Sequence, residues 1–177
     1  MTIEEICRKY HITNYTINED ETIDVDGGVD WSGKGLEKLP LEFKYVRGNF
    51  SCSGNKLTTL EGCPREVGGN FMCSDNLLTS LEGCPKYIGY DFDCYGNQLT
   101  NIDFLPEELG GDFYCLGNPV GTMVNGLSLE FLQFFKRYKV VKGDVVNLKR
   151  LKYIMNILEI KDRGILINEI EKNYTIV

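Results

Sequence analysis

The chain of 177 residues lacks most of what membrane proteins and enzymes need. No apolar run reaches the ~18 residues of a membrane-spanning helix, and the opening MTIEEICRKY lacks the apolar core of a secretory signal. Its only histidine, His11, has no partner motif, and G-x-S-x-G, H-E-x-x-H and phosphate-loop motifs are absent. We therefore expect a cytoplasmic protein that spans no membrane and is not an enzyme.

The 26 acidic and 19 basic residues are unevenly distributed. Residues 1–30 hold eight acids against two bases, and residues 31–126 hold twelve against seven. Residues 127–177 reverse the balance, with ten bases against six acids. An acidic body is repelled by nucleic acid and by anionic lipid, so we expect neither as a partner. The basic tail reads as the solvated face of a helix rather than as an anion-binding surface.

Close pairs of cysteines are also missing, although the chain has seven cysteines. Zinc modules place two cysteines two to four residues apart, because one turn must aim both thiolates at one ion. An odd number without a secretory signal favours a reducing compartment and free thiols. We expect no metal and no cofactor. The cysteines are Cys7, Cys52, Cys63, Cys73, Cys84, Cys94 and Cys115.

What the chain does have is a repeat with a period of 21 residues. The segments NFSCSGNKLTTLEGCPREVGG, NFMCSDNLLTSLEGCPKYIGY and DFDCYGNQLTNIDFLPEELGG follow one another from residue 49, and a weaker copy precedes them. A constant period of 20 to 29 residues indicates a solenoid in which each repeat is one turn. The aligned positions are Phe50, Phe71, Phe92 and Phe113; Cys52, Cys73, Cys94 and Cys115; Asn55, Asn76, Asn97 and Asn118; Leu57, Leu78, Leu99 and Val120.

The pattern F-x-C-x-x-N predicts how each turn is built. Phe and Cys alternate, so both point inward from a short strand that pairs in parallel with the next turn, ~4.8 Å away. The cysteines then act as small buried apolar groups, and we interpret Cys63 and Cys84 as a second such column. The asparagine is expected to turn inward and to satisfy backbone groups that no strand serves. The glycine pair before each strand is expected to allow a tight turn.

The skeleton F-x-C-x-x-N-x-L-T-x-L resembles the short bacterial type of leucine-rich repeat. Together with YTINEDETIDVDGGVDWSGKGLEKLP and VVNLKRLKYIMNILE, it also resembles small repeat proteins of large tailed phages. The resemblance covers about residues 10–160. It implies an α/β leucine-rich-repeat solenoid of about five turns. It also implies a phage protein in the cytoplasm of a bacterial host.

Solenoids expose sheet edges at both ends and need caps. Thr2-x-x-Glu5 forms a capping box for a helix over residues 3–10, and residues 15–18 and 22–25 read as a hairpin around an acidic turn. After the repeats we expect three helices, from Ser128, from Asn147 and over 165–172, with paired extended segments around 143–144. The domains are then an N-terminal cap (1–28), the solenoid (29–124) and a C-terminal helical cap (125–177).

The acidic residues of the N-terminal cap admit a second interpretation. Asp24, Asp26 and Asp30 alternate with apolar residues, which favours a solvated strand face. A calcium loop is the alternative, but the spacing D-x-D-x-x-x-D is not that of an EF-hand, and Gly35 stands where its closing glutamate belongs.

Candidate binding residues lie at the outward positions around each F-x-C strand. These positions change along the chain from small and polar to aromatic and acidic, and a tyrosine replaces a glycine of the repeat at residue 90. Tyrosine is enriched at interface hot spots, and the acids favour a partner with a basic surface. The alternative is that these are ordinary solvated positions. The candidates are Met72, Tyr90, Asp91, Asp93, Tyr95, Asp112, Tyr114 and Leu116.

We therefore expect a non-enzymatic protein-interaction module. If the phage resemblance holds, it inhibits or redirects a host protein. Two alternatives stay open: a structural component that assembles with its own copies through an uncapped edge or its Phe-rich tail, and a small-ligand or metal-binding protein that uses the cysteine columns.

Overall fold

The computed structural model describes residues 1–120, 141–142, 145–146 and 175–176. Helix α1 (Ile3–Lys9) precedes strands that alternate between two sheets. The first sheet contains β1 (Tyr15–Ile17), β2 (Ile23–Val25), β4 (Phe43–Val46), β6 (Glu66–Val67), β8 (Tyr87–Ile88) and β10 (Glu108–Leu109). The second sheet contains β3 (Val29–Asp30), β5 (Phe50–Ser51), β7 (Phe71–Met72), β9 (Phe92–Asp93) and β11 (Phe113–Tyr114).

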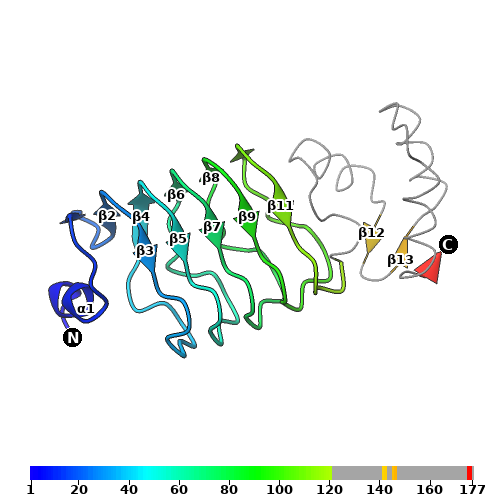
Figure 1. The fold of residues 1–177 in the computed structure, drawn as a ribbon, viewed down its shortest axis with the longest axis horizontal. Helices are drawn as coiled ribbons and strands as arrows, with labels where there is room; N and C mark the ends of the chain where they lie inside the picture. Colours follow the sequence, from blue (N-terminus) through cyan, green and yellow to red (C-terminus); the bar gives the residue numbers. More distant parts are fainter. Residues whose placement is uncertain (121–140, 143–144, 147–174, 177) are drawn as a thin grey trace.

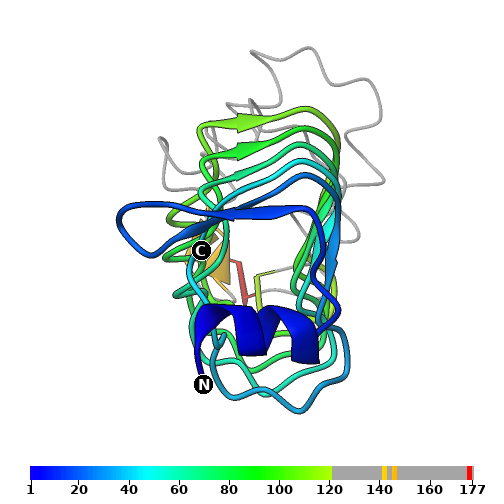
Figure 2. The same ribbon diagram turned by 90° about the vertical axis from the view of Figure 1, so that its left-hand side faces the viewer.

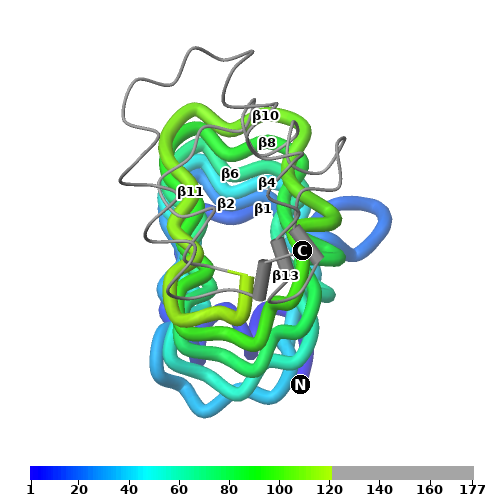
Figure 3. The backbone as a smooth tube through the Cα atoms, turned by 90° about the vertical axis from the view of Figure 1, so that its right-hand side faces the viewer, coloured from blue at the N-terminus to red at the C-terminus, as the bar shows by residue number. Residues whose placement is uncertain are grey.

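Each turn of the chain adds one strand to each sheet, so the molecule is a solenoid of parallel strands (Figure 1). In the second sheet, Val29 pairs with Phe50, and Phe50 with Phe71, so the register advances by one 21-residue period at every step. The same step relates β9 to β11. This gives about four turns rather than the five expected. Viewed along the axis, the turns superpose (Figure 3).

The core consists of columns of identical side chains, as predicted. Phe50, Phe71, Phe92 and Phe113 are fully buried, and consecutive rings lie 5.2–5.8 Å apart. The four cysteines of the F-x-C pattern are also fully buried. In the first turn Trp31 stands at the cysteine position and packs edge-on against Phe43. The wider indole fills the end of the core, where no earlier turn stacks on the column.

A buried asparagine ladder joins the turns. Asn76 Nδ2 donates to the carbonyl of Cys73 in its own turn (3.1 Å) and to that of Cys52 in the turn before (3.0 Å). Its Oδ1 accepts from the N–H of Leu57, also in the turn before, at 3.0 Å. Asn55, Asn97 and Asn118 repeat this arrangement. An amide suits the position because it is donor and acceptor at once.

At the N-terminal end, helix α1 begins with the predicted capping box. Glu5 N–H donates to Thr2 Oγ1, and Thr2 N–H donates to a carboxylate oxygen of Glu5. Ile6 and Cys7 of the helix join the core. The predicted hairpin is also present, because β1 and β2 pair antiparallel. Helix and hairpin lie across this end of the solenoid (Figure 2).

The hairpin covers the first edge of only one of the two sheets. It adds β1 outside β2 in the first sheet, whereas the second sheet starts at β3. Two sheets present two edges, and one three-residue strand can pair with only one of them. The free edge of the first sheet is therefore strand β1.

Three further strands are described near the C-terminus. β12 (Val141–Lys142) and β13 (Val145–Val146) pair antiparallel, which confirms the paired extended segments around 143–144. β14 (Thr175–Ile176) adds in parallel to β13 and was not anticipated. The three predicted C-terminal helices lie outside the described residues.

Gly68, Gly89 and Gly110 lie in the tight bends that join the strands of the two sheets, as expected, but none of them has a positive φ. A Cβ placed on Gly89 would instead collide with the carbonyl oxygen of Gly68 in the turn before, and a Cβ on Gly110 with that of Gly89. At this corner the backbones of successive turns touch directly, so only hydrogen fits between them.

We expect Asn76→Ala to lower the free energy of unfolding by about 2–4 kcal/mol. The substitution removes Oδ1 and Nδ2, leaves the buried Leu57 N–H without its acceptor, and takes one of two amide donors from the Cys52 carbonyl, which keeps the donor of Asn55. Urea denaturation measures the change. The control is Thr79→Ala, an exposed position in the same turn, where a change within about 0.5 kcal/mol is expected. Equal stability of the two variants would contradict the ladder's role.

We expect Gly89→Ala to destabilise the solenoid by about 1–3 kcal/mol, because the new methyl group meets the backbone of Gly68. Gly27→Ala is the matched control, since a Cβ there has nothing within 4 Å. Thermal unfolding of the two variants should separate them clearly. A Gly89→Ala protein as stable as the control would show that the turns can move apart at this corner.

Candidate partner-binding face

The predicted binding residues lie on the outer surface of the second sheet and at its adjoining corner. Met72, Asp93 and Tyr114 occupy one outward column, because Met72 pairs with Asp93 and Asp93 with Tyr114. Tyr95 and Leu116 form the next column one period apart, and both are exposed. The structure thus brings the predicted residues of the last turns together. We call Tyr90, Asp91, Asp93, Tyr95, Asp112, Tyr114 and Leu116 the aromatic–acidic patch.

Asp91 and Asp112 belong to a second ladder that sequence reasoning missed. The N–H of Asn70 donates to Asn49 Oδ1 (2.8 Å), that of Asp91 to Asn70 Oδ1 (3.0 Å), and that of Asp112 to Asp91 Oδ1 (2.9 Å). Each side-chain oxygen therefore holds the backbone of the next turn. The signal was a column in which only Asn and Asp occur, since both carry an oxygen on Cγ. Asp91 is thus partly structural, whereas Asp112 is exposed.

Asp93 supports Tyr95 from within the same turn. Its Oδ1 accepts from the N–H of Tyr95 at 2.9 Å, a local turn that Asp side chains favour. The Tyr95 ring leans over the next turn, because a Cβ at Gly117 would lie 3.4 Å from Tyr95 Cε2. Glycine at 117 therefore leaves the ring room. The side chain is held at its base and keeps about half of its surface exposed (48%).

Tyr114 lies among three carboxylates. Its hydroxyl points to Asp112 Oδ2 at 3.4 Å. The negative charges of Asp112 and then Asp91 raise the pKa of Tyr114 above its ordinary value of 10.0, and Asp93 adds a smaller contribution. These groups therefore share one electrostatic environment, although they come from two different turns. The patch presents a neutral phenol inside a negative field, which suits a cationic group of a partner.

Tyr90 breaks the glycine rule of its own column. A Cβ at Gly69 or at Gly111 would collide with the ladder oxygen of the turn before. Tyr90 stands at the equivalent place, and its N–H bond to the Gly69 carbonyl is longer (3.2 Å) than that from Gly111 to the Tyr90 carbonyl (3.0 Å). Both bonds are kept, so the tyrosine at this place leaves the contacts between the turns intact. Its ring is the most exposed of the patch, at 65%.

The same face is chemically different in the earlier turns. Ser32 Oγ and Ser51 Oγ lie 2.6 Å apart, and Ser74 Oγ donates to Ser53 Oγ at 2.9 Å. These hydroxyls satisfy one another and offer little to a partner. Met72 lies between the two regions and is half-buried, so it contributes less surface than expected. The aromatic–acidic patch is therefore confined to the last two described turns.

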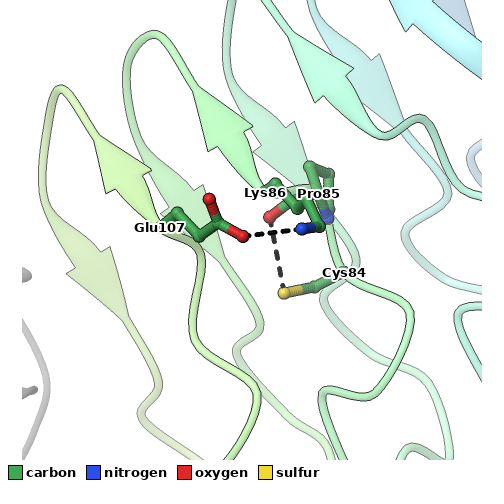
Figure 4. A network of polar contacts seen from close by, with 4 residues as sticks. All are labelled: Cys84, Pro85, Lys86 and Glu107. Atoms are coloured by element: carbon green, nitrogen blue, oxygen red, sulfur yellow. Dashed lines mark hydrogen bonds and ion pairs between the residues drawn. The ribbon is translucent and has the colours of Figure 1, made fainter.

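The cysteine columns show no sign of a reactive site. Burial raises the pKa of the Cys73 and Cys94 thiols well above the ordinary value, and that of Cys84 to about 12. The Cys84 thiol donates to the carbonyl of Phe104 at 2.9 Å, and Sγ also lies 3.6 Å from the carbonyl oxygen of Pro85, the contact drawn in Figure 4. Beside it, Lys86 and Glu107 form an exposed ion pair across one turn (2.7 Å). Thiols that stay protonated neither ligate metal nor attack electrophiles well.

The part of the chain that the structure describes contains no group of three or more His, Cys, Asp or Glu side chains placed to hold a metal ion. It also contains no helix of the length and apolarity that a bilayer crossing demands. Comparison with known proteins identifies no relative: no family model, no curated protein and no solved structure matches the sequence.

We expect Asp112→Asn to lower the pKa of Tyr114 toward its ordinary value, because Asp112 is the largest cause of the shift. A pH titration followed by NMR of ring-labelled tyrosine, assigned with Tyr114→Phe, measures it. Asp103→Asn, an exposed acid outside the patch, is the control and should leave that pKa unchanged. An unchanged Tyr114 pKa in Asp112→Asn would show that the two side chains do not interact in solution.

Proposed function

We propose that this protein is a non-enzymatic interaction module that binds a basic surface of another protein through the aromatic–acidic patch. The observation that carries the proposal is the convergence of exposed tyrosines and carboxylates on two adjacent turns. Asp93 accepts from the backbone N–H of Tyr95, and the Tyr114 hydroxyl donates to Asp112, so each tyrosine has a carboxylate of the patch next to it. Exposed tyrosine side chains are common anchors of interfaces.

The chemistry of the patch defines the partner. Arginine and lysine side chains stack on tyrosine rings and pair with carboxylates, so a basic segment satisfies both halves of the patch at once. Acids at the rim also raise the association rate and make it depend on salt. A standard interface needs about 800 Å² per partner, which a rigid sheet face with its adjoining corner can present.

The resemblance to short bacterial leucine-rich repeats and to small repeat proteins of tailed phages extends the proposal. On that basis the solenoid is a leucine-rich-repeat domain of the short type, and its C-terminal segment forms a helical cap. The partner is then a protein of the bacterial host, met in the host cytoplasm. The consequence of binding is inhibition or redirection of that host protein.

The first test is a pull-down from bacterial lysate with the wild-type protein and with Tyr95→Ala/Tyr114→Ala. We expect one dominant partner that the double variant loses, with an affinity loss of at least about 100-fold, because two hot-spot rings are removed. Tyr87→Ala is the matched control, since Tyr87 is similarly exposed (42%) but lies on the first sheet.

The charge of the patch is tested separately with Asp93→Asn/Asp112→Asn, which keeps the shape and the hydrogen-bond acceptors. We expect weaker binding and a smaller effect of salt on the affinity. A captured partner that both patch variants retain, at wild-type affinity, would place the interface elsewhere and overturn the proposal. So would a partner whose binding site carries no basic residues.

A further inference from the structure

The outermost strand of the first sheet presents free hydrogen-bonding groups. In an antiparallel pair, alternate residues direct their N–H and C=O groups to opposite sides. Asn18 N–H donates to the Thr22 carbonyl, and Asp26 N–H donates to the Asn14 carbonyl, so the even-numbered residues of β1 face β2. The backbone groups of Tyr15 and Ile17 therefore point away from the sheet. Within the described residues, no other strand pairs with this side of β1.

This edge lacks the features that usually keep an edge strand apart from others. Natural edges carry lysine, proline or a bulge. The six residues from Thr13 to Asn18 contain no charge and no proline, and three of them, Tyr15, Thr16 and Ile17, are good strand formers. Ile17 pairs with the fully buried Ile23 yet keeps 38% of its own surface exposed. An apolar side chain of the inner layer is thus left half-covered at the end of the sheet.

We propose that β1 pairs antiparallel with β1 of a second copy of this chain, so that the first sheets of the two molecules become one continuous sheet. The pairing places Thr16 opposite Thr16 of the second copy. Tyr15 then faces Ile17 of the second copy, and each of these two pairs exchanges both backbone hydrogen bonds. The Tyr15 ring covers the exposed part of Ile17, an aromatic–β-branched pair of the kind that stabilises sheets.

Charge complementarity supports the same register. The tip of the hairpin, Glu19 to Glu21, is acidic and projects beyond the wall of the solenoid (Figures 2 and 3). Asp20 is engaged within the tip by Thr22, which leaves the two glutamates free. In the proposed pairing, Glu19 lies opposite Thr13 of the second copy. Thr13 lines a groove between α1 and β1, whose other lining residues are Glu4, Arg8, His11, Ile12 and Tyr15.

The guanidinium of Arg8 thus meets the acidic tip of the other molecule, and the contact occurs twice because the pair is two-fold symmetric. This interface is separate from the aromatic–acidic patch. β1 begins the first sheet at the α1 end, whereas the patch lies at the far end of the second sheet (Figure 1). The proposal therefore stands or falls independently of the proposed function, and a dimer would present two patches at once.

Sedimentation equilibrium over a range of protein concentrations tests the pairing. We expect a monomer–dimer equilibrium in the wild type and at least a tenfold weaker dimer in Ile17→Lys, because a charged edge opposes pairing. Thr58→Lys adds the same charge at an exposed position in a later turn and should leave the dimer unchanged. Reversing the charges in Arg8→Glu should weaken the dimer, and Arg8→Glu/Glu19→Arg should restore it.

A cross-link tests the register without relying on the stability of these variants. Facing residues of a non-hydrogen-bonded antiparallel pair have Cα atoms about 4.5 Å apart, which a disulfide can span. Mild oxidation of Thr16→Cys should give a covalent dimer, whereas Thr58→Cys should not. A monomer at every concentration, an Ile17→Lys dimer as tight as wild type, or equal cross-linking at residues 16 and 58 would each overturn the proposal.

Discussion

The structure depends on one constraint, the hydrogen bonds that join each turn of the solenoid to the next. From Asp24 onward the paired strands are offset by 21 residues at every step, so each paired residue meets its counterpart one turn away. The buried asparagine ladder fixes this spacing, because each amide holds carbonyls of two turns and accepts from an N–H in the earlier one. A turn of different length would break these contacts on both of its sides. Because the turns have this constant spacing, the same side chains stack on one another, which gives the columns of Phe, Cys and Leu.

Regular stacking also determines what the surface can do. Since inward positions are occupied by the core and the ladders, most of the variation lies at outward positions, where serine changes to tyrosine and aspartate along one face. The second ladder, formed by Asn49, Asn70, Asp91 and Asp112, is an exception to this separation of structural and surface positions. Asp91 uses one carboxylate oxygen to hold the next turn and still contributes negative charge to the environment of Tyr114. A structural role and a binding role thus share a residue, which gives the patch charge without a flexible side chain.

The sequence predicted the solenoid well because the copies of its repeat can be aligned with one another. Comparing three copies shows which positions tolerate change, and the inward Phe, Cys and Asn columns were found in this way. What it did not predict depends on contacts between backbones. The sequence alone does not show that the backbones of successive turns approach each other closely at Gly68 and Gly89. The edge left at β1 was missed for a similar reason, because a hairpin pattern does not reveal which of two sheets it extends. Tyr90, Tyr95 and Tyr114 are exposed, as their outward positions in the repeat predict, but the hydrogen bonds from Tyr95 to Asp93 and from Tyr114 to Asp112 required the fold.

A solenoid in which each turn contacts only the turns next to it tolerates the duplication of a whole repeat. Copying or deleting one whole period in frame leaves every remaining turn with the neighbours it expects, so the inherited core and ladders need no repair. A change of fewer residues is penalised at once by the asparagine column. A solenoid of this kind can therefore change by two routes, in the number of its periods and in the identity of its outward residues. The length of the face and its chemistry are then independent of each other, and Tyr90 shows that the glycine column also accepts a large side chain.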